Sequence, residues 1–136
     1  MTVKPTPPLD PWTRPYWEAA RENRLLLQYC EKCARHIFYP RRYCPFCDND
    51  QLSWVESRGL GHIYAFTVVY NNAPSAFLPD MPYVIAIVKL DEGVQMMSNI
   101  VGCSPEQVQS ELRVEVVFEK VSEEVTLPKF RLVKQA

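Results

Sequence analysis

Four cysteines in two pairs are the residues whose types and spacing most clearly indicate chemistry in this chain. Cys30 and Cys33 form one Cys-x-x-Cys pair, and ten residues separate it from a second pair, Cys44 and Cys47. Each pair offers two thiolates from a tight turn, and two facing turns complete the tetrahedron that Zn²⁺ adopts in structural sites. We therefore expect one structural zinc ion, with no open coordination position for catalysis.

The rest of the sequence favours a metal over disulfides as the explanation for these pairs. Met1–Pro11 lacks the apolar core of a signal peptide, and no apolar run reaches the roughly 20 residues that cross a bilayer. We therefore expect a cytoplasmic protein without membrane contact, in a compartment where thiols stay reduced. The fifth cysteine, Cys103, has no partner at ligand spacing and is expected to be a small buried or half-buried apolar residue.

The charge balance bears on which classes of partner the chain can have. Its 136 residues carry a formal net charge of −1, with 23% charged and 47% hydrophobic residues. This composition is ordinary for a soluble globular protein and argues against a dedicated nucleic-acid binder, which usually has a basic excess. Zinc-binding and small barrel modules do occur in nucleic-acid proteins, so that class remains the alternative function.

The segments around the cysteines alternate between strand-like and turn-like composition. We expect strands at Leu25–Tyr29, Ile37–Tyr39 and Gln51–Glu56, with one cysteine turn after each of the first two. This alternation predicts a zinc ribbon over residues 29–56. Because the ribbon is too small for much of a core, we expect metal binding to supply on the order of 10 kcal/mol of its folding free energy.

Residues 1–28 are predicted to form an N-terminal extension and a helix. The helical pattern runs from Arg14 to about Arg24, with Thr13 as the N-cap. The segment has more aromatic surface than so short an element needs. These side chains either pack on the rest of the chain or dock on a partner subunit, because aromatic residues are enriched in interface cores. The candidate interface residues are Trp12, Tyr16 and Trp17.

Residues 57–136 are predicted to form a second unit made mainly of strands. The expected strands are His62–Tyr70, Tyr83–Leu90, Val94–Val101, Leu112–Glu119 and Val125–Leu132. Five strands and one short helix near Ser104 predict a five-stranded barrel of the OB type, so the whole chain is mainly β. Because Tyr83–Leu90 is apolar almost throughout, we expect this strand to be buried on both faces.

The order of motifs along the chain resembles a known family. Leu-x-Leu-Gln-x-Cys-x-x-Cys at residues 25–33 is followed by Phe-Tyr-Pro-Arg and Cys-Pro-x-Cys within residues 38–47. Gly-x-Gly-x-Ile-Tyr-x-Phe-Thr follows at residues 59–67. In combination, and over residues 16–131, these motifs closely resemble the acyl-CoA-associated family that joins a rubredoxin-like zinc ribbon to an OB fold.

The resemblance implies an accessory role and not an enzyme. Members of the family look like non-catalytic scaffold subunits of thiolase-fold, aldolase and MaoC-like hydratase enzymes in lipid, steroid or related acyl metabolism. The resemblance therefore implies a protein partner of one of these types, and a role in binding or channelling the acyl-CoA substrate of that partner.

Two turns depart from the family pattern. Glycine often follows the second cysteine of each turn because the backbone there needs a positive φ, but this chain has Ala34 and Asp48. Alanine tolerates that conformation poorly, so we expect the first turn to be strained or shaped differently. Asn23 replaces the usual glycine after the helix and is a suitable left-handed C-cap.

Several arginines are candidates for binding the phosphates of CoA. Arg35, Arg41 and Arg42 lie between the cysteine turns beside aromatic residues, and Arg58 lies at the junction with the second unit. They form either a solvated rim of the ribbon or a phosphate site in a cleft between ribbon and barrel. The apolar loop Ala73–Met81 is expected to line an acyl channel.

The sequence offers little for catalysis. It has only two histidines: His36 in the ribbon, which either replaces a cysteine as a metal ligand or faces solvent, and His62 after a glycine turn, which is expected to be structural. It contains no nucleophile triad motif, no His-Glu-x-x-His and no phosphate-binding P-loop. We therefore expect no catalytic residues in this chain.

Overall fold

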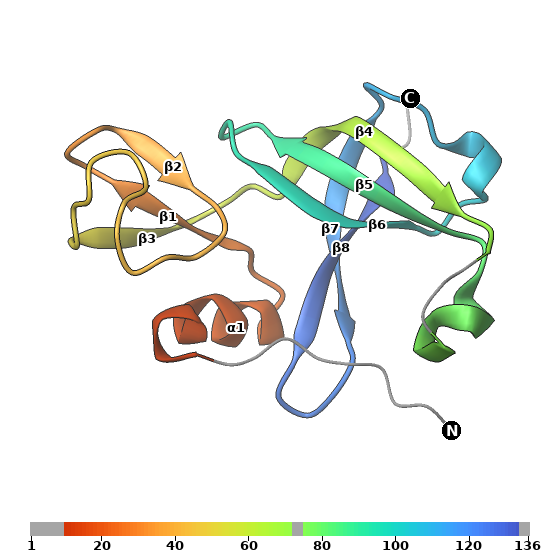
Figure 1. Ribbon diagram of the computed structural model, residues 1–136, viewed down its shortest axis with the longest axis horizontal. Helices are drawn as coiled ribbons and strands as arrows, with labels where there is room; N and C mark the ends of the chain where they lie inside the picture. The colour runs from red at the N-terminus through yellow and green to blue at the C-terminus, as the bar shows by residue number, and fades with distance from the viewer. Residues whose placement is uncertain (1–9, 72–74, 134–136) are drawn as a thin grey trace.

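The computed structural model describes residues 10–71 and 75–133, and shows a helix, a three-stranded sheet and a closed barrel (Figure 1). The predicted extension over residues 1–9, and Ala73 and Pro74 of the predicted channel loop, lie outside the described residues. The expected fold class is confirmed, because a short helix and a cysteine-bearing sheet precede a five-stranded barrel.

The N-terminal helix α1 spans Arg14–Arg21 and follows a 3₁₀ turn at Pro11–Thr13. Thr13 occupies the N-cap position, but its hydroxyl donates back to the Asp10 carbonyl at 3.0 Å and caps nothing in the helix. The helix ends before the predicted Arg24 because Asn23 turns into the left-handed region at φ 62°. That conformation is the C-cap expected for asparagine.

The ribbon is a sheet of three antiparallel strands in the order β2-β1-β3. The strands are β1 Leu26–Cys30, β2 Arg35–Ile37 and β3 Leu52–Glu56. The second strand is earlier than the predicted Ile37–Tyr39. It begins directly after the first cysteine turn, where Cys30 and Arg35 face each other as the first pair of the β1–β2 ladder.

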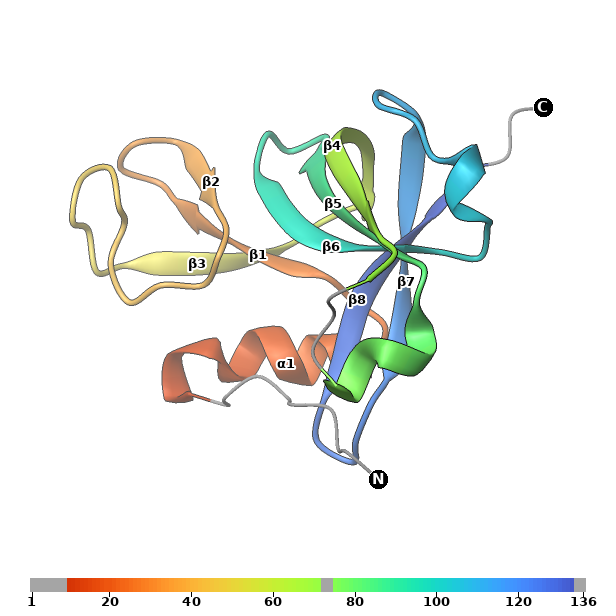
Figure 2. The same cartoon turned by 45° about the vertical axis from the view of Figure 1, so that its right-hand side comes forward.

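The barrel contains the other five strands, in the closed order β4-β5-β6-β8-β7 (Figure 2). The strands are β4 Leu60–Val69, β5 Tyr83–Leu90, β6 Gln95–Val101, β7 Arg113–Lys120 and β8 Thr126–Leu132. All neighbours are antiparallel except β6 and β8, which pair in parallel at only two positions near Ile100 and Val101. In the described residues no further backbone ladder joins β6 to β8, although the Ser98 hydroxyl donates to the Pro128 carbonyl at 2.8 Å.

One apolar core joins the barrel to the elements before it. Ile63, Val88 and Phe130 are fully buried inside the barrel, and the same cluster takes in Tyr16 from α1 and Leu27 from β1. Cys103 is half-buried against this cluster, as predicted. The ribbon itself has a second, much smaller cluster of buried residues: Cys30, Ile37 and Cys44.

The central barrel strand β5 corrects one prediction. Its side chains alternate strictly, with Val84 and Val88 buried in the core and Ile85 and Ile87 half-buried on the outside. The expectation of burial on both faces is therefore wrong within the described residues. In a closed antiparallel barrel one face of a strand lines the core, and the other is covered only where another layer packs on it.

The junction between ribbon and barrel is held by the β5–β6 turn. Glu92 accepts hydrogen bonds from the Ser57 hydroxyl at 2.9 Å and from the Arg58 backbone N–H at 3.0 Å. The chain then turns at Gly59, which has φ +73°, and runs at Gly61 so close to the Lys89 backbone that a Cβ would collide with it. The two glycines thus make the sharp turn into the barrel.

Candidate metal centre and the cleft beside it

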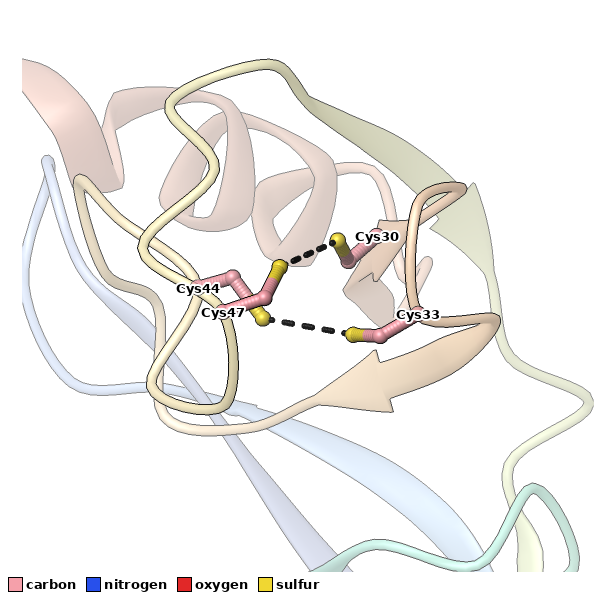
Figure 3. Close-up of side chains that lie close together, drawn as sticks. All are labelled: Cys30, Cys33, Cys44 and Cys47. Atoms are coloured by element: carbon pink, nitrogen blue, oxygen red, sulfur yellow. Dashed lines mark hydrogen bonds between the residues drawn. The ribbon is translucent and has the colours of Figure 1, made fainter.

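The four paired cysteines converge on one point (Figure 3). Their four Sγ atoms all lie within 4.8 Å of one another, and the Cys30–Cys47 and Cys33–Cys44 sulfurs are 3.6 and 3.5 Å apart. A Zn–S bond of about 2.3 Å gives a regular tetrahedron with edges of about 3.8 Å, close to these separations. The cysteines are thus positioned to bind one zinc ion.

The two turns that carry the cysteines share a backbone conformation. Ala34 and Asp48, each directly after the second cysteine of a pair, have φ of 55° and 61°. The positive φ expected there is confirmed, and Ala34 adopts it despite its Cβ, which costs about 1 kcal/mol relative to glycine. The first turn has therefore kept the shape of the second and is strained, not reshaped.

Hydrogen bonds around the sulfurs favour the thiolate form. The Asn49 amide donates to Cys30 Sγ at 3.5 Å and lowers the pKa of Cys30 to about 6, while the Phe46 backbone N–H donates to Cys44 Sγ at 3.4 Å. Burial raises the pKa of Cys33 to about 12. A cation is needed for such crowded sulfurs to be thiolates together, and Asn49 is a supporting residue that the sequence reasoning missed.

An apolar cleft of about 400 Å³ lies between α1, the ribbon and the barrel. Its lining residues come from all three parts of the fold, and they are Thr13, Tyr16, Trp17, Phe38, Tyr39, Pro40, Met96, Met97, Ser98, Asn99, Leu127, Pro128 and Lys129. It forms where β6 and β8 separate. The Tyr39 hydroxyl accepts a hydrogen bond from the Met97 backbone N–H at 3.2 Å, which ties the ribbon to this open edge of β6.

A second cavity of about 310 Å³ lies on the other side of the first turn of α1. Trp12, Arg41, Arg42 and the acidic Asp50 are among its lining residues, and the Arg42 guanidinium lies over the Trp12 ring at 5.5 Å. The buried amide of Gln28 fixes the arginine segment, because it donates to the Arg41 carbonyl at 2.8 Å and accepts from the Arg41 N–H at 2.7 Å. Gln28 thus fixes the backbone of this segment, while the Arg41 and Arg42 side chains stay exposed.

The structure brings only part of the predicted arginine set together. Arg41 and Arg42 line the same cavity, but Arg35 lies over the Phe46 ring at 4.4 Å on another part of the ribbon. Arg58 lies at the junction with the barrel and lines neither cavity. A four-arginine site is therefore not formed.

The three aromatic residues of the N-terminal segment differ in exposure. Tyr16 is only 4% exposed, packs edge-on against Trp17 at 4.8 Å and belongs to the core, so it offers little surface to a partner. Burial raises the pKa of Tyr16 well above its usual range. Trp12 is 41% exposed and Trp17 is half-buried in the cleft, so these two stay available to a ligand or partner.

The remaining sequence candidates lie away from both cavities. His62 forms a 3.6 Å pair with Glu111, and His36 lies against the Tyr29 ring at 5.0 Å. The described part of the predicted channel loop forms a 3₁₀ helix at Ser75–Asp80 that lines neither cavity, contrary to expectation. Over residues 10–71 and 75–133, no helix has the length and apolar character needed to span a bilayer.

Comparison with known proteins gives the family of this chain. A family model described as the rubredoxin-like zinc ribbon domain of ChsH2 matches residues 17–53, and one described as the C-terminal OB-fold domain of ChsH2 matches residues 54–119. The chain belongs to the ChsH2 family. It is also 34% identical to a DUF35 domain-containing scaffold protein of Methanocaldococcus jannaschii, over 79% of this chain and 77% of that protein.

Two further relatives are much longer than this chain. A probable enoyl-CoA hydratase alpha subunit of Thermomonospora curvata is 33% identical over 95% of this chain, which spans only 40% of that protein. The 3-oxo-4,17-pregnadiene-20-carboxyl-CoA hydratase alpha subunit of Mycobacterium tuberculosis is 27% identical over 76% of this chain and 32% of its own length. The chain thus corresponds to a part of these hydratase subunits.

Solved structures share the whole arrangement. A chain of the structure described as Ltp2-ChsH2(DUF35) aldolase superposes with a TM-score of 0.82 at 32% identity, over 93% of this chain and 98% of that one. A DUF35 protein of unknown function from Sulfolobus solfataricus superposes with a TM-score of 0.65 at 16% identity, which shows a common fold. The expected family membership is therefore confirmed.

Proposed function

We propose that this chain is a non-catalytic accessory subunit that binds an acyl-CoA enzyme of the thiolase-fold, aldolase or MaoC-like hydratase type. The proposal rests mainly on the almost end-to-end likeness, at TM-score 0.82, to a chain of the Ltp2-ChsH2(DUF35) aldolase structure. The name of the Methanocaldococcus relative, a scaffold protein, supports the same role. In this role the chain also helps to bind or channel the acyl-CoA substrate of its partner.

The chemistry of the cleft supports a non-catalytic role. Among the described residues its lining contains no histidine, cysteine or carboxylate, so none of them offers a general base of ordinary strength to the cleft. The one lysine there, Lys129, forms a 2.7 Å ion pair with Glu119. Catalytic residues would therefore come from the partner, whose active site the accessory chain completes or shields.

The two cavities together suit the parts of a CoA thioester. Trp12 and Pro15 line the cationic cavity, and Thr13 and Trp17 line the apolar cleft, so the first turn of α1 separates the two. Phosphates would lie near Arg41 and Arg42, because guanidinium groups bind phosphate oxygens in a fork geometry. The pantetheine arm or acyl chain would lie in the cleft, which is within the usual size range of ligand pockets.

The nucleic-acid alternative has less support. OB folds bind oligonucleotides on the face of their second and third strands, which are β5 and β6 in this chain. The outward side chains there include Ile85, Ile87 and Met97 in place of a basic stripe. We therefore expect little retention on immobilised single-stranded DNA. Tight retention that salt reverses would favour the alternative.

Co-purification tests the proposed role. The chain is co-expressed with the thiolase-, aldolase- or hydratase-like protein encoded beside it, with an affinity tag on one of the two. We expect a stable complex that survives size-exclusion chromatography. If the two proteins never co-elute, and the enzyme alone is soluble and fully active, the accessory role is wrong.

The CoA site is tested separately by calorimetric titration of CoA into the complex. The Arg42→Ala variant is expected to weaken CoA binding about tenfold or more, since it removes a charge-assisted contact to phosphate. Arg131→Ala is the matched control, because Arg131 pairs with Glu115 on the barrel and lines neither cavity. Equal CoA affinity in both variants would place the phosphates elsewhere.

A further inference from the structure

The outer surface of β4, β5 and β6 carries an uncharged patch. Strand register places its side chains in two cross-strand rows, and its members are Ala65, Ile87, Met97, Thr67, Ile85 and Asn99. Met97 is 60% exposed, Thr67 is exposed, and the other four are half-buried. An antiparallel strand with one face in solvent normally alternates apolar and polar residues. The central strand of the patch, β5, is instead apolar on both faces from Val84 to Val88.

The adjoining wall of the barrel, made by β7 and β8, is charged where the patch is not. There the outward side chains of β7 and β8 form ion pairs, with Glu115 at 2.7 Å from Arg131 and Glu119 at 2.7 Å from Lys129. The only α-helix of the described residues, α1, packs against β1, β7 and β8 (Figure 2). The patch on β4–β6 has neither charged pairs nor that helix over it.

The size of the patch indicates what kind of partner it fits. Three strands about 4.8 Å apart and two rows of side chains about 7 Å apart cover roughly 200 Å². A stable interface buries about 800 Å² on each partner, so two copies of this chain joined through the patch alone would associate weakly. A partner must therefore also cover neighbouring surface.

The patch is continuous with the cleft, which supplies that neighbouring surface. Met97 and Asn99 belong to the patch and also line the cleft beside α1 and Tyr39. A protein that covers both would bury the apolar strand face and close the cleft from solvent in one interface. Because the patch has no charged residue, the partner surface over it must be aliphatic or aromatic and uncharged, whereas Lys129, paired with Glu119, is a charged group at the cleft.

From these observations we infer that the outer patch of β4–β6 is the docking surface for the catalytic partner, an inference that rests on the proposed accessory role. The partner presents an uncharged apolar surface to Ile85, Ile87 and Met97 and covers the mouth of the cleft. A substrate in the cleft is then enclosed between the two proteins.

The test compares three single substitutions to glutamate in the full chain. Met97→Glu and Ile87→Glu place a carboxylate in the patch, and Val121→Glu places one at an exposed apolar position in the turn after β7. The affinity of each for the enzyme encoded beside this chain is measured by titration, with zinc content and circular dichroism as checks of folding. We expect the two patch variants to bind about 100-fold more weakly, and Val121→Glu to change binding less than about threefold.

Each outcome decides the inference. If the wild type binds and both patch variants bind within about threefold of it, the docking surface is elsewhere and the accessory role stands. If the wild type itself does not bind, the accessory role and the inference both fail. Light scattering that shows a dimer of this chain alone, dissociated by Met97→Glu, would overturn the inference in favour of a second copy. Should Ile87→Glu not fold, Met97→Glu decides, because its side chain is largely in solvent.

Discussion

The ribbon and the barrel are stabilised in different ways. Apart from Leu27, which packs into the barrel core, the ribbon has a buried cluster of only Cys30, Ile37 and Cys44, so its structure depends mainly on the metal that joins its two turns. The barrel has a fully packed core around residues such as Ile63, Val88 and Phe130 and needs no metal. One half therefore folds around a cation and the other around apolar side chains.

This difference in stabilisation indicates which part of the molecule holds the candidate site. The metal has four protein ligands and no open position, so its contribution is to fix the ribbon. Once fixed, the ribbon holds Tyr39 against β6 and Arg41 against Gln28, and both cavities form beside the ribbon and not at the metal. The candidate site is thus built between the two differently stabilised halves.

The largest effect is expected from Cys44→Ser, which leaves three ligands and should release the zinc and unfold the ribbon. The barrel should keep its strands, because its core contains no metal ligand. Elemental analysis and hydrogen exchange check this, with Cys103→Ser as the control cysteine substitution that leaves zinc binding intact. A well-folded wild-type protein without zinc, or a Cys44→Ser variant with a protected ribbon, would contradict the metal's structural role.

The corresponding substitution in the barrel, Phe130→Ala, should destabilise the barrel core. Phe130 is fully buried in the core, and its truncation should lower the free energy of unfolding by about 3–5 kcal/mol. Chemical denaturation measures the loss, and Leu78→Ala, at an exposed position, is the control. If Phe130→Ala releases zinc at a denaturant concentration below that which unfolds the barrel, the stabilities of ribbon and barrel are coupled more closely than their separate cores indicate.

The junction should respond to Glu92→Ala by a smaller amount. The substitution removes the acceptor for the Ser57 hydroxyl and the Arg58 N–H and should cost about 1–2 kcal/mol. We expect faster hydrogen exchange at the Arg58 amide with zinc content unchanged. Unchanged exchange there would show that the β5–β6 turn does not hold the two halves together.

The ribbon offers a stabilising change in Ala34→Gly. Ala34 has φ 55°, and glycine adopts this conformation without the steric cost of a Cβ. The metal-bound ribbon should gain up to about 1 kcal/mol, reduced by the greater freedom of glycine in the unfolded chain. In competition with a chelator, the variant should lose zinc more slowly than the wild type. Faster zinc loss would show that the turn at Ala34 is not strained.

The smallest effect concerns pH and the barrel surface. A hydrogen bond from Arg113 at 2.7 Å lowers the pKa of Asp91 below its ordinary value of 3.8. Because the folded state has the lower pKa, the pair stabilises the protein above pH 3.8 and loses that contribution as the pH falls further. Asp91→Asn should flatten the acid limb of the stability curve slightly, as expected for an exposed pair. A marked loss of stability of Asp91→Asn at neutral pH would show that the Asp91–Arg113 pair contributes more than an exposed ion pair should.

Local signals in the sequence were enough for the fold and the metal ligands. The spacing of Cys30, Cys33, Cys44 and Cys47 is a short-range constraint, and the bounds of Tyr83–Leu90 follow from its continuous apolar pattern. The positive φ at Ala34 and Asp48 follows from the shape that a cysteine turn must have. Such features depend on neighbouring residues alone, which is why a pattern could predict them.

The cleft could not be predicted because it depends on contacts between distant segments. Met97 reads as an ordinary strand residue, and only the separation of β6 from β8 exposes it beside α1. Tyr16 looked available to a partner, but the barrel core buries it. Asn49 approaches Cys30 only after the ribbon has closed, so no sequence pattern indicated its hydrogen bond to the sulfur.

The central claim is that this chain completes an acyl-CoA enzyme without being one. Its most direct test is the kcat/KM of the enzyme encoded beside it, measured with acyl-CoA substrate as this chain is added. We expect kcat/KM to rise and to saturate at a fixed stoichiometry, with no turnover by this chain alone. Unchanged kcat/KM at saturating concentrations of this chain, or turnover by this chain in isolation, would contradict the account.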